Sequence, residues 1–297
     1  MSAPLLLVYP GNETLADALV AQLACDVAAL ALHHFPDGET LVTLPAVKDR
    51  EVLLLCSLDR PDAKLAPLLF AADAARDLGA TRVGLIAPYL AYMRQDRRFH
   101  PGEAVTSRSF AGVISHHFDF LATVDPHLHR YHDLAEIYSI PARAVSSAAA
   151  IAAWIRREVK QPLLVGPDEE SAQWIEAVAA LEGLPHTVLT KTRHDDFNVE
   201  VSLPDAGRWA GLTPVLVDDI VSSAHTMIAA AGSLKKMGLA APVCVGVHAL
   251  FGGTAYAELK AAGAARIATC NCVPHDSNAI DVMPALADGL AALLKTA

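Results

Sequence analysis

Residues 213–227 place two adjacent carboxylates next to a group of small polar side chains, a combination that can bind both an anion and hydroxyl groups. The apolar run Pro214–Val217 has the pattern of a short buried parallel strand, and Asp218 and Asp219 follow it directly. Further on, Met227–Met237 has the spacing of an amphipathic helix. The pattern therefore predicts a strand that ends in two carboxylates, then a loop, then the N-terminus of a helix.

The loop between this strand and this helix is expected to bind a phosphate group. A helix N-terminus favours an anion because its first N–H groups have no partner within the helix and because the helix dipole is positive there. Carboxylates at the carboxyl edge of an open α/β sheet can accept hydrogen bonds from neighbouring sugar hydroxyls. Together these features predict a ribose 5-phosphate site; the alternative is an acidic strand end followed by an ordinary N-capping serine. The predicted contact residues are Asp218, Asp219, Ser222, Ser223, Ala224, His225 and Thr226.

A second candidate binding segment, residues 89–98, contains three arginines and two tyrosines after a predicted strand. Guanidinium groups suit phosphate oxygens, and aromatic or arginine planes suit the face of a purine. The alternative is a solvated basic loop paired with Asp96 and Glu103.

A third segment, Lys191–Asp196, is polar and has no apolar periodicity, so we expect a mobile loop there. A lysine and an arginine separated by one residue can close over a phosphate that is being transferred and stabilise the charge that develops on it. The alternative is a surface loop that carries two solvated cations.

Two strand ends offer metal ligands: His127 follows one predicted strand and Asp168 follows another. An imidazole or a carboxylate, together with phosphate oxygens and water, is a donor set that Mg²⁺ accepts. Zinc is the weaker interpretation. The spacing of His127, His129 and His132 allows three nitrogens to converge, but no cysteine or acidic ligand is clearly paired with them.

The composition limits the classes of function. The 297 residues carry a formal net charge of −10, which argues against a general binder of nucleic acid or of membrane surfaces. The five cysteines show no metal-ligand spacing, which indicates a reducing compartment, and no apolar run approaches the roughly 20 residues needed to span a bilayer. We therefore expect a cytoplasmic enzyme that acts on small molecules.

Short apolar strands alternate with longer helices along the whole chain, which predicts an α/β fold with mostly parallel sheets flanked by helices. The second half repeats the plan of the first, so we expect two tandem domains, 1–143 and 144–279, with a closing helix within 280–297 that can pack on the first. The predicted strands are 4–9, 27–33, 51–56, 82–87, 120–124, 162–165, 186–189, 214–217, 243–249 and 266–269. The predicted helices are 13–23, 63–78, 106–118, 146–160, 169–181, 227–237, 255–262 and 283–294.

The order of several motifs resembles the ribose-phosphate pyrophosphokinase family, the synthetases of phosphoribosyl pyrophosphate (PRPP). The resemblance runs from about residue 5 to about residue 275, and the short loop that begins at Lys191, together with Ser222, is closer to the archaeal-type branch. The sugar-phosphate loop departs from the family pattern at Ala224 and His225, where small residues and most often glycine are usual. The motifs are Phe-x-Asp-Gly-Glu (35–39), Pro-Tyr-x-x-Tyr-x-Arg-Gln-Asp-Arg (88–97), Val-Asp-x-His (124–127), Pro-Asp (167–168), Lys-x-Arg (191–193) and Asp-Asp-Ile-Val-Ser-Ser (218–223).

The resemblance implies two phosphoribosyltransferase-like (Rossmann-like) domains in a homodimer or higher homo-oligomer, with ATP held mainly by the first domain and ribose 5-phosphate by the second. In the family, the anomeric hydroxyl attacks the β-phosphorus of MgATP to give PRPP and AMP. By the same resemblance, His127 and Asp168 engage Mg²⁺, Lys191 and Arg193 stabilise the transferring group, and Arg193 also contacts the substrate. The implied nucleotide-binding residues are Phe35, Asp37, Gly38, Glu39, Arg94, Gln95 and Asp96.

Two other functions remain open at this point: a non-catalytic regulatory or scaffold paralogue, and a phosphoribosyltransferase. The substitution at His225 favours the paralogue, whereas the intact Lys191 and Arg193 disfavour it. If position 225 requires a positive φ, we expect the imidazole to be strained and to crowd the phosphate; the alternative is that His225 adds a hydrogen-bond donor that strengthens anion binding.

Overall fold

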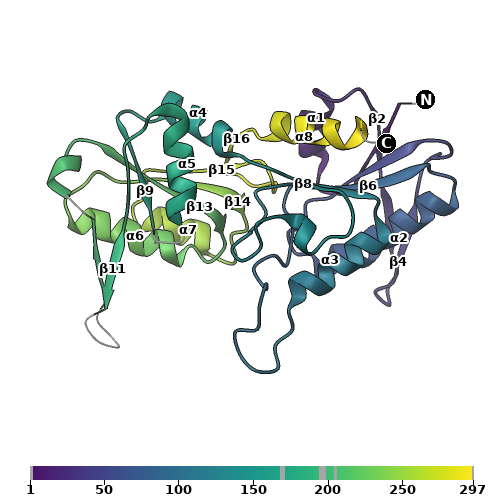
Figure 1. Cartoon of the computed structure of the whole chain (residues 1–297), viewed down its shortest axis with the longest axis horizontal. Coiled ribbons are helices and arrows are strands. Elements are labelled where there is room, and N and C mark those ends of the chain that lie inside the picture. Colours follow the sequence, from purple (N-terminus) through teal and green to yellow (C-terminus); the bar gives the residue numbers. More distant parts are fainter. Residues whose placement is uncertain (1–2, 168–170, 194–198, 204–205, 296–297) are drawn as a thin grey trace. The chain divides into compact units, whose positions relative to one another are not determined.

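The structure is a computed structural model that describes residues 3–167, 171–193, 199–203 and 206–295. The chain forms two compact units (Figure 1). The first unit comprises Met1–Ser146, Cys272–Pro274 and Val282–Ala297, and the second comprises Ser147–Asn271 and His275–Asp281. The C-terminal segment of the chain therefore returns to the unit that the N-terminal segment begins.

The first unit is built on a six-stranded sheet of order β2-β1-β5-β6-β7-β8, in which all neighbours are parallel. The four central strands, β1, β5, β6 and β7, are buried apolar runs, as expected for a parallel sheet covered on both faces, whereas the edge strands β2 and β8 are mostly exposed or half-buried. Helices α1 and α8 pack together on one face, and α2 and α3 cover the other (Figure 1). The elements are β1 (Leu5–Val8), α1 (Glu13–Val20), β2 (Asp26–Ala29), β5 (Glu51–Leu55), α2 (Asp62–Asp77), β6 (Arg82–Ala87), α3 (Thr106–His117), β7 (Phe120–Val124), η1 (Leu134–Glu136), β8 (Ala142–Val145) and α8 (Met283–Lys295).

The second unit repeats this plan in a parallel six-stranded sheet of order β10-β9-β13-β14-β15-β16. An apolar cluster packs α6 and α7 against the sheet. The elements are α4 (Ala148–Glu158), β9 (Pro162–Gly166), α5 (Ala172–Glu182), β10 (His186–Val188), η3 (Ala206–Trp209), β13 (Thr213–Val221), α6 (His225–Lys236), β14 (Val243–Ala249), α7 (Ala255–Ala261), β15 (Arg266–Cys270) and β16 (Asn278–Ile280).

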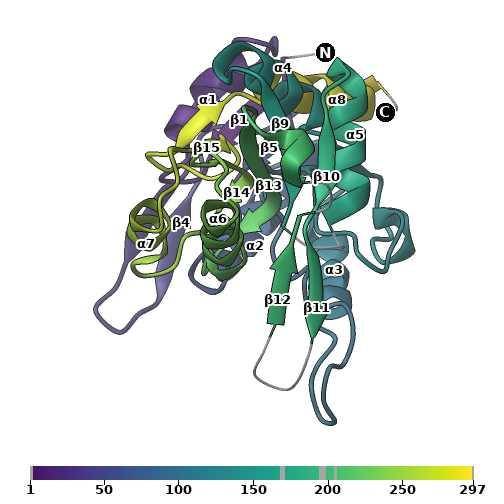
Figure 2. The same cartoon turned by 90° about the vertical axis from the view of Figure 1, so that its left-hand side faces the viewer.

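Each unit also carries an antiparallel hairpin between the second and third strands of its sheet in chain order. The hairpin of the first unit is β3 (Ala31–His34) with β4 (Thr40–Thr43), and that of the second is β11 (Thr190–Arg193) with β12 (Val199–Ser202). Figure 2 shows β11 and β12 side by side and projecting from their unit. The two units therefore share one strand order and one hairpin position, in agreement with the repeated plan that the sequence pattern predicts.

The predicted fold class is confirmed, but four predicted elements need correction. The predicted strand 27–33 is two strands, because the buried Leu30 separates β2 from β3 and β3 leaves the sheet to pair with β4. The predicted loop at 191–196 is wrong for 191–193, which belong to β11, while 194–198 lie outside the described residues. The predicted strand 214–217 continues to Val221, and the helix predicted to begin at 227 begins at His225.

Candidate functional site

Parallel sheets of this order have a topological switch point, the place where helices change from one face to the other and where ligands usually bind. In the first unit, this point lies between the carboxyl ends of β1 and β5; in the second, it lies between those of β9 and β13. The two switch points are built from very different side chains.

At the switch point of the second unit, β13 carries the carboxylate pair. Asp218 and Asp219 are half-buried within the strand, and Asp218 is paired in register with Gly246 of β14. The backbone N–H of Asp219 donates a hydrogen bond of 2.9 Å to Asp218 Oδ1. A Cβ on Gly246 would lie 2.5 Å from Val221 Cγ2, so only glycine allows β14 to approach this end of β13. The strand continues through the aspartates because Asp218, Ile220 and Val221 pair with β14.

The loop that follows β13 is hydrogen-bonded to the loop that follows β14, and it leads directly into helix α6. The N–H of Leu250 donates to the carbonyl of Val221 at 3.0 Å, and the N–H of Gly252 donates to the carbonyl of Ser222 at 3.2 Å. Ser223 is exposed. The N–H groups of the first turn of α6 therefore stand beside hydroxyl side chains at the edge of the sheet, which is the arrangement of an anion site.

Ala224, not His225, takes the left-handed conformation in this loop. Ala224 is the N-cap of α6 with φ +57° and is buried in the core of the second unit, whereas His225 is an exposed residue of the first helical turn. The hypothesis that His225 is strained by a positive φ is therefore wrong, because the helix begins two residues earlier than predicted. Thr226 is half-buried in the same helical turn.

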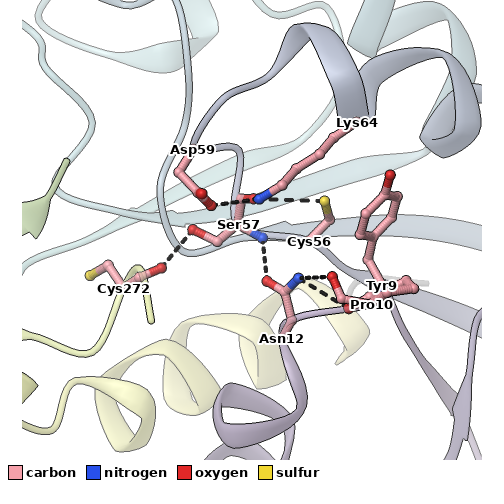
Figure 3. A network of polar contacts seen from close by, with 8 residues as sticks. All are labelled: Tyr9, Pro10, Asn12, Cys56, Ser57, Asp59, Lys64 and Cys272. Atoms are coloured by element: carbon pink, nitrogen blue, oxygen red, sulfur yellow. Dashed lines mark hydrogen bonds and ion pairs between the residues drawn. The ribbon is translucent and has the colours of Figure 1, made fainter. Parts of the chain in front are cut away.

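In the first unit, a network of side chains bonds the two loops at the switch point to each other (Figure 3). Asn12, which is 1% exposed, accepts a hydrogen bond of 2.8 Å from the N–H of Ser57 and donates one of 3.0 Å to the carbonyl of Tyr9. The Lys64 ammonium group donates to the carbonyl of Ser57 at 2.8 Å and to Asp59 at 2.6 Å. The polar groups at this switch point are thus occupied by one another.

The same network holds the returning C-terminal segment. The buried hydroxyl of Ser57 donates a hydrogen bond of 2.6 Å to the carbonyl of Cys272 (Figure 3). Burial raises the pKa of the neighbouring Cys56 thiol to about 12, so this cysteine is a packed, protonated side chain.

The residues that the resemblance assigns to the nucleotide lie in two other places in the first unit. One place is the turn of the hairpin β3–β4, where the N–H of Phe35 donates to the carbonyl of Glu39 at 2.9 Å and Gly38 has φ +94°. The N–H of Glu39 also donates to Asp37 Oδ1 at 3.1 Å. The Phe35 ring is 41% exposed and meets the His33 ring edge-on at 4.7 Å, so an aromatic face is presented at the surface.

The second place is the loop between β6 and α3. Arg94 and Gln95 are exposed, whereas Asp96 is buried and receives hydrogen bonds of 2.7 and 2.8 Å from the Arg130 guanidinium group. Asp96 therefore holds Arg130. Arg130 was not among the predicted site residues, because it stands 34 positions away in the sequence and only the fold brings the two together.

The remaining predicted residues are placed only in part. His127 follows β7 and is half-buried, and Asp168 lies outside the described residues. Lys191 and Arg193 stand in β11 opposite Val201 and Val199 of β12. The zinc interpretation gains no support, because among the described parts of the chain no group of three or more His, Cys, Asp or Glu side chains is placed to hold a metal ion.

Comparison with known proteins agrees with this architecture. Residues 5–117 match the N-terminal domain of ribose phosphate pyrophosphokinase, and residues 133–286 match the phosphoribosyl transferase domain. The ribose-phosphate pyrophosphokinase of Methanopyrus kandleri is 34% identical over 275 residues, which cover 92% of this chain and 93% of that protein. That of Halobacterium salinarum is 32% identical over 288 residues, which cover 96% and 100%. The crystal structure of phosphoribosylpyrophosphate synthetase from Mycobacterium smegmatis has the same fold, with a TM-score of 0.84 at 23% identity over 99% of this chain and 100% of that one.

Each of the two α/β units is built on a parallel sheet, and the second has a carboxylate pair and a helix N-terminus at its switch point. This fold and this site define a protein of the phosphoribosyltransferase fold class. Within that class, the chain belongs to the ribose-phosphate pyrophosphokinase family, a family of transferases. The predicted resemblance, including its archaeal affinity, is confirmed, and membership favours this enzyme over a non-catalytic paralogue or a phosphoribosyltransferase.

Proposed function

We propose that the protein transfers the β,γ-pyrophosphoryl group of MgATP to the C1 hydroxyl of ribose 5-phosphate and releases PRPP and AMP. The observation that carries this proposal is the strand, loop and helix at residues 213–236, which brings a carboxylate pair and a helix N-terminus to one switch point in a chain of this family. The protein forms no covalent bond to the transferred group in such a reaction, so positioning of the substrates and charge neutralisation should provide most of the rate enhancement.

Ribose 5-phosphate is assigned to the second unit. Carboxylates accept hydrogen bonds, so Asp218 and Asp219 suit the ring hydroxyls of the sugar as donors. Both aspartates lie in the C-terminal half of β13, near the carboxyl edge of the sheet. The 5-phosphate suits the segment Ser222–Thr226, where hydroxyls and the N–H groups of the first helical turn come together.

ATP is assigned to the first unit, at the hairpin turn and the loop after β6. The switch point of this unit is unsuited to the nucleotide because Asn12 and Lys64 already satisfy its polar groups. The exposed Phe35 ring suits a purine face, and Arg94 with Gln95 suits phosphate oxygens. We assign to Asp96 a supporting part, since its buried carboxylate is bound to Arg130.

His127 and Asp168 are the residues proposed to hold Mg²⁺. His127 fits this part because it follows the carboxyl end of β7 and is half-buried, so its imidazole is a nitrogen ligand at the edge of the sheet where ligands of such folds usually bind. The ion, when bound, neutralises charge on the phosphates that move. Lys191 and Arg193 of β11 are proposed to stabilise the transferring group, with Arg193 also contacting the substrate.

The test is an assay of the purified protein with ATP, Mg²⁺ and ribose 5-phosphate that follows the formation of AMP and PRPP. Formation of AMP that depends on both substrates supports the proposal. A phosphoribosyltransferase would instead consume PRPP in the presence of a nucleobase, and a non-catalytic paralogue would do neither. We also propose a homodimer or higher homo-oligomer, which light scattering of the same sample measures.

A further inference from the structure

Tyr92 stands in a backbone conformation that a large side chain rarely adopts. Its φ is +63°, and among the described residues it is the only aromatic one with a positive φ. For a bulky residue this conformation is a true outlier, which persists only where the surroundings hold it in place. Tyr92 lies in the loop between β6 and α3, two residues before Arg94.

Two contacts hold Tyr92 in this conformation, one made by its hydroxyl and one by its ring. The hydroxyl donates a hydrogen bond to Asp62, the first residue of α2, and the ring centroid lies 5.0 Å from that of Phe110, a buried residue of α3. The hydrogen bond to Asp62, with burial as a smaller cause, raises the pKa of Tyr92 to about 12, so the hydroxyl remains a donor at neutral pH. The side chain therefore ties this loop to both helices on that face of the sheet.

After the left-handed turn at Tyr92, two buried residues flank two exposed ones. Met93 is 1% exposed and Asp96 is 6% exposed, whereas Arg94 and Gln95 between them are exposed. The N–H of Gln95 donates to the carbonyl of Tyr92 at 3.1 Å, and the carbonyl of Gln95 accepts from the N–H of Ser107 at 3.2 Å. Arg94 and Gln95 are thus presented to solvent from a backbone that is fixed on both sides.

We infer that Tyr92, held by Asp62 and Phe110, is a positioning residue that presents Arg94 and Gln95 to the phosphates of ATP. This inference rests on the proposed function, because it takes Arg94 and Gln95 as nucleotide contacts. A preorganised pair of side chains binds the nucleotide more tightly, since less freedom is lost on binding. Loss of the Asp62 contact should therefore weaken the binding of ATP without affecting the binding of ribose 5-phosphate.

The test compares steady-state kinetics of Tyr92→Phe, Asp62→Ala, Asp62→Asn and the double variant Tyr92→Phe/Asp62→Ala. Tyr92→Phe keeps the ring against Phe110 and removes only the hydroxyl, and we expect the KM for ATP to rise about three- to tenfold, as for the loss of one hydrogen bond. Asp62→Ala should give the same rise, and Asp62→Asn should stay near the wild type because its amide oxygen still accepts. The double variant should be no worse than either single variant, because all three remove one shared contact.

Tyr138→Phe is the matched control. It also removes a tyrosine hydroxyl that touches this loop, but only a weak contact of 3.9 Å to the sulfur of Met93. Its KM for ATP should stay within twofold of the wild type, and the KM for ribose 5-phosphate should stay within twofold in every variant.

If Tyr92→Phe and Asp62→Ala lower only the melting temperature and leave the KM for ATP unchanged, the contact is merely structural and the inference is wrong. Arg94→Ala distinguishes a failure of the proposed function. If this variant also binds ATP normally, the proposed nucleotide site is wrong and the role of Tyr92 is overturned with it. If Arg94→Ala raises the KM for ATP while Tyr92→Phe does not, only the inference about Tyr92 fails.

Discussion

Among single residues, Lys191 is the one on which the proposed transfer depends most. Its ammonium group is expected to stabilise charge that develops only during transfer, and removing one such preorganised donor typically costs at least about a hundredfold in kcat. Lys191→Ala should therefore lower kcat by at least about a hundredfold while the KM for ribose 5-phosphate changes little, because the phosphate loop follows a different strand. Initial rates of AMP formation measure both quantities.

Lys260→Ala is the control for Lys191→Ala, since Lys260 is an exposed residue of α7 outside every proposed contact. It should retain wild-type turnover. Near-normal turnover of Lys191→Ala would remove this lysine from the proposed mechanism.

The strain in the sugar-phosphate loop is assigned to Ala224, so substitutions at 224 and 225 should behave differently. Ala224→Val should lower the free energy of unfolding by about 2–4 kcal/mol, because a branched side chain is strained at φ +57° and overpacks a buried site. His225→Gly should cost no more than about 1 kcal/mol, the helix-propensity cost of glycine, and should not lower the KM for ribose 5-phosphate.

Urea unfolding followed by tryptophan fluorescence measures these two effects, since Trp154, Trp174 and Trp209 all lie in the second unit. Equal losses of stability for the two variants would contradict the assignment of the strain to Ala224. A lower KM for ribose 5-phosphate in His225→Gly would restore the crowding hypothesis in another form.

Asn12 should matter for stability more than its size suggests. Asn12→Ala leaves the buried N–H of Ser57 without this partner, whereas the carbonyl of Tyr9 keeps the hydrogen bond of 3.1 Å from the backbone N–H of residue 12. We expect a loss of about 1–3 kcal/mol in the unfolding of the first unit, the cost of one unsatisfied buried group, measured by circular dichroism. Asn271→Ala, which removes an exposed hydrogen bond to Asp281, should cost much less. Equal effects of the two substitutions would show that the Asn12 network is not a stabilising feature.

The sequence indicated which residue types could do chemistry, but not how their backbones are arranged. The positive φ falls on Ala224 because the helix begins at His225, and a helix start is the least certain feature of a periodic pattern. Asp96 was predicted as a nucleotide contact from its motif alone. Its pairing with Arg130 is a tertiary contact that no local pattern contains.

At the scale of elements, the strands predicted best are those with both faces buried. β6, β7 and β14 have their predicted bounds because each is a continuous apolar run. The hairpins were missed because their strands are short and lack that pattern. β11 has the sequence Thr-Lys-Thr-Arg and is held by backbone pairing with β12, which local hydrophobicity cannot reveal.

Gly84 of β6 gives a prediction about how the central strands pack. A Cβ on Gly84 would lie 2.0 Å from the ring of Phe120, its neighbour in β7, and Phe120 is fully buried. Gly84→Ala should therefore destabilise the first unit by about 2–3 kcal/mol through overpacking. Circular dichroism during thermal unfolding measures the effect.

A second substitution tests the cause of that destabilisation. Phe120→Leu replaces the ring with a smaller side chain, so Gly84→Ala should cost clearly less in the Phe120→Leu background than in the wild type. Simple additivity of the two substitutions would show that the ring of Phe120 is not what excludes a side chain at position 84.

At the scale of the whole molecule, the two units share one plan but differ in how they use it. Both have the same strand order and an inserted hairpin at the same place. The second unit has Asp218, Asp219 and a helix N-terminus at its switch point, whereas the first has Asn12 and Lys64 bonded to neighbouring loops. This difference is the physical basis for the proposal that the second unit binds a sugar phosphate at its switch point and the first binds a nucleotide through separate loops. Among the described residues, no helix is long and apolar enough to cross a membrane.

The return of the C-terminal helix makes the first unit depend on both ends of the chain. α8 packs on α1, β7 and β8, and Gly289 lies so close to Val145 that an added Cβ would stand 2.5 Å from its Cγ2. Arg82 donates a hydrogen bond of 3.2 Å to the carbonyl of Leu293. The buried apolar residues of α8 are Met283, Leu286, Ala287, Leu290 and Leu293. Burying each large one stabilises by about 1.5–3 kcal/mol, so together they rival the whole stability of a typical domain.

Truncation after Asp281 should therefore unfold the first unit and leave the second folded. The tryptophan fluorescence transition, which reports only on the second unit, should persist, while part of the circular dichroism transition is lost and proteolysis leaves a protected fragment near 147–281. Gly289→Ala should destabilise the first unit by a smaller amount than the truncation does. In this variant the helix is still present, but the added methyl group clashes with the side chain of Val145. If the truncated chain keeps both transitions, α8 is an accessory of the first unit, and residues 1–146 suffice for its core.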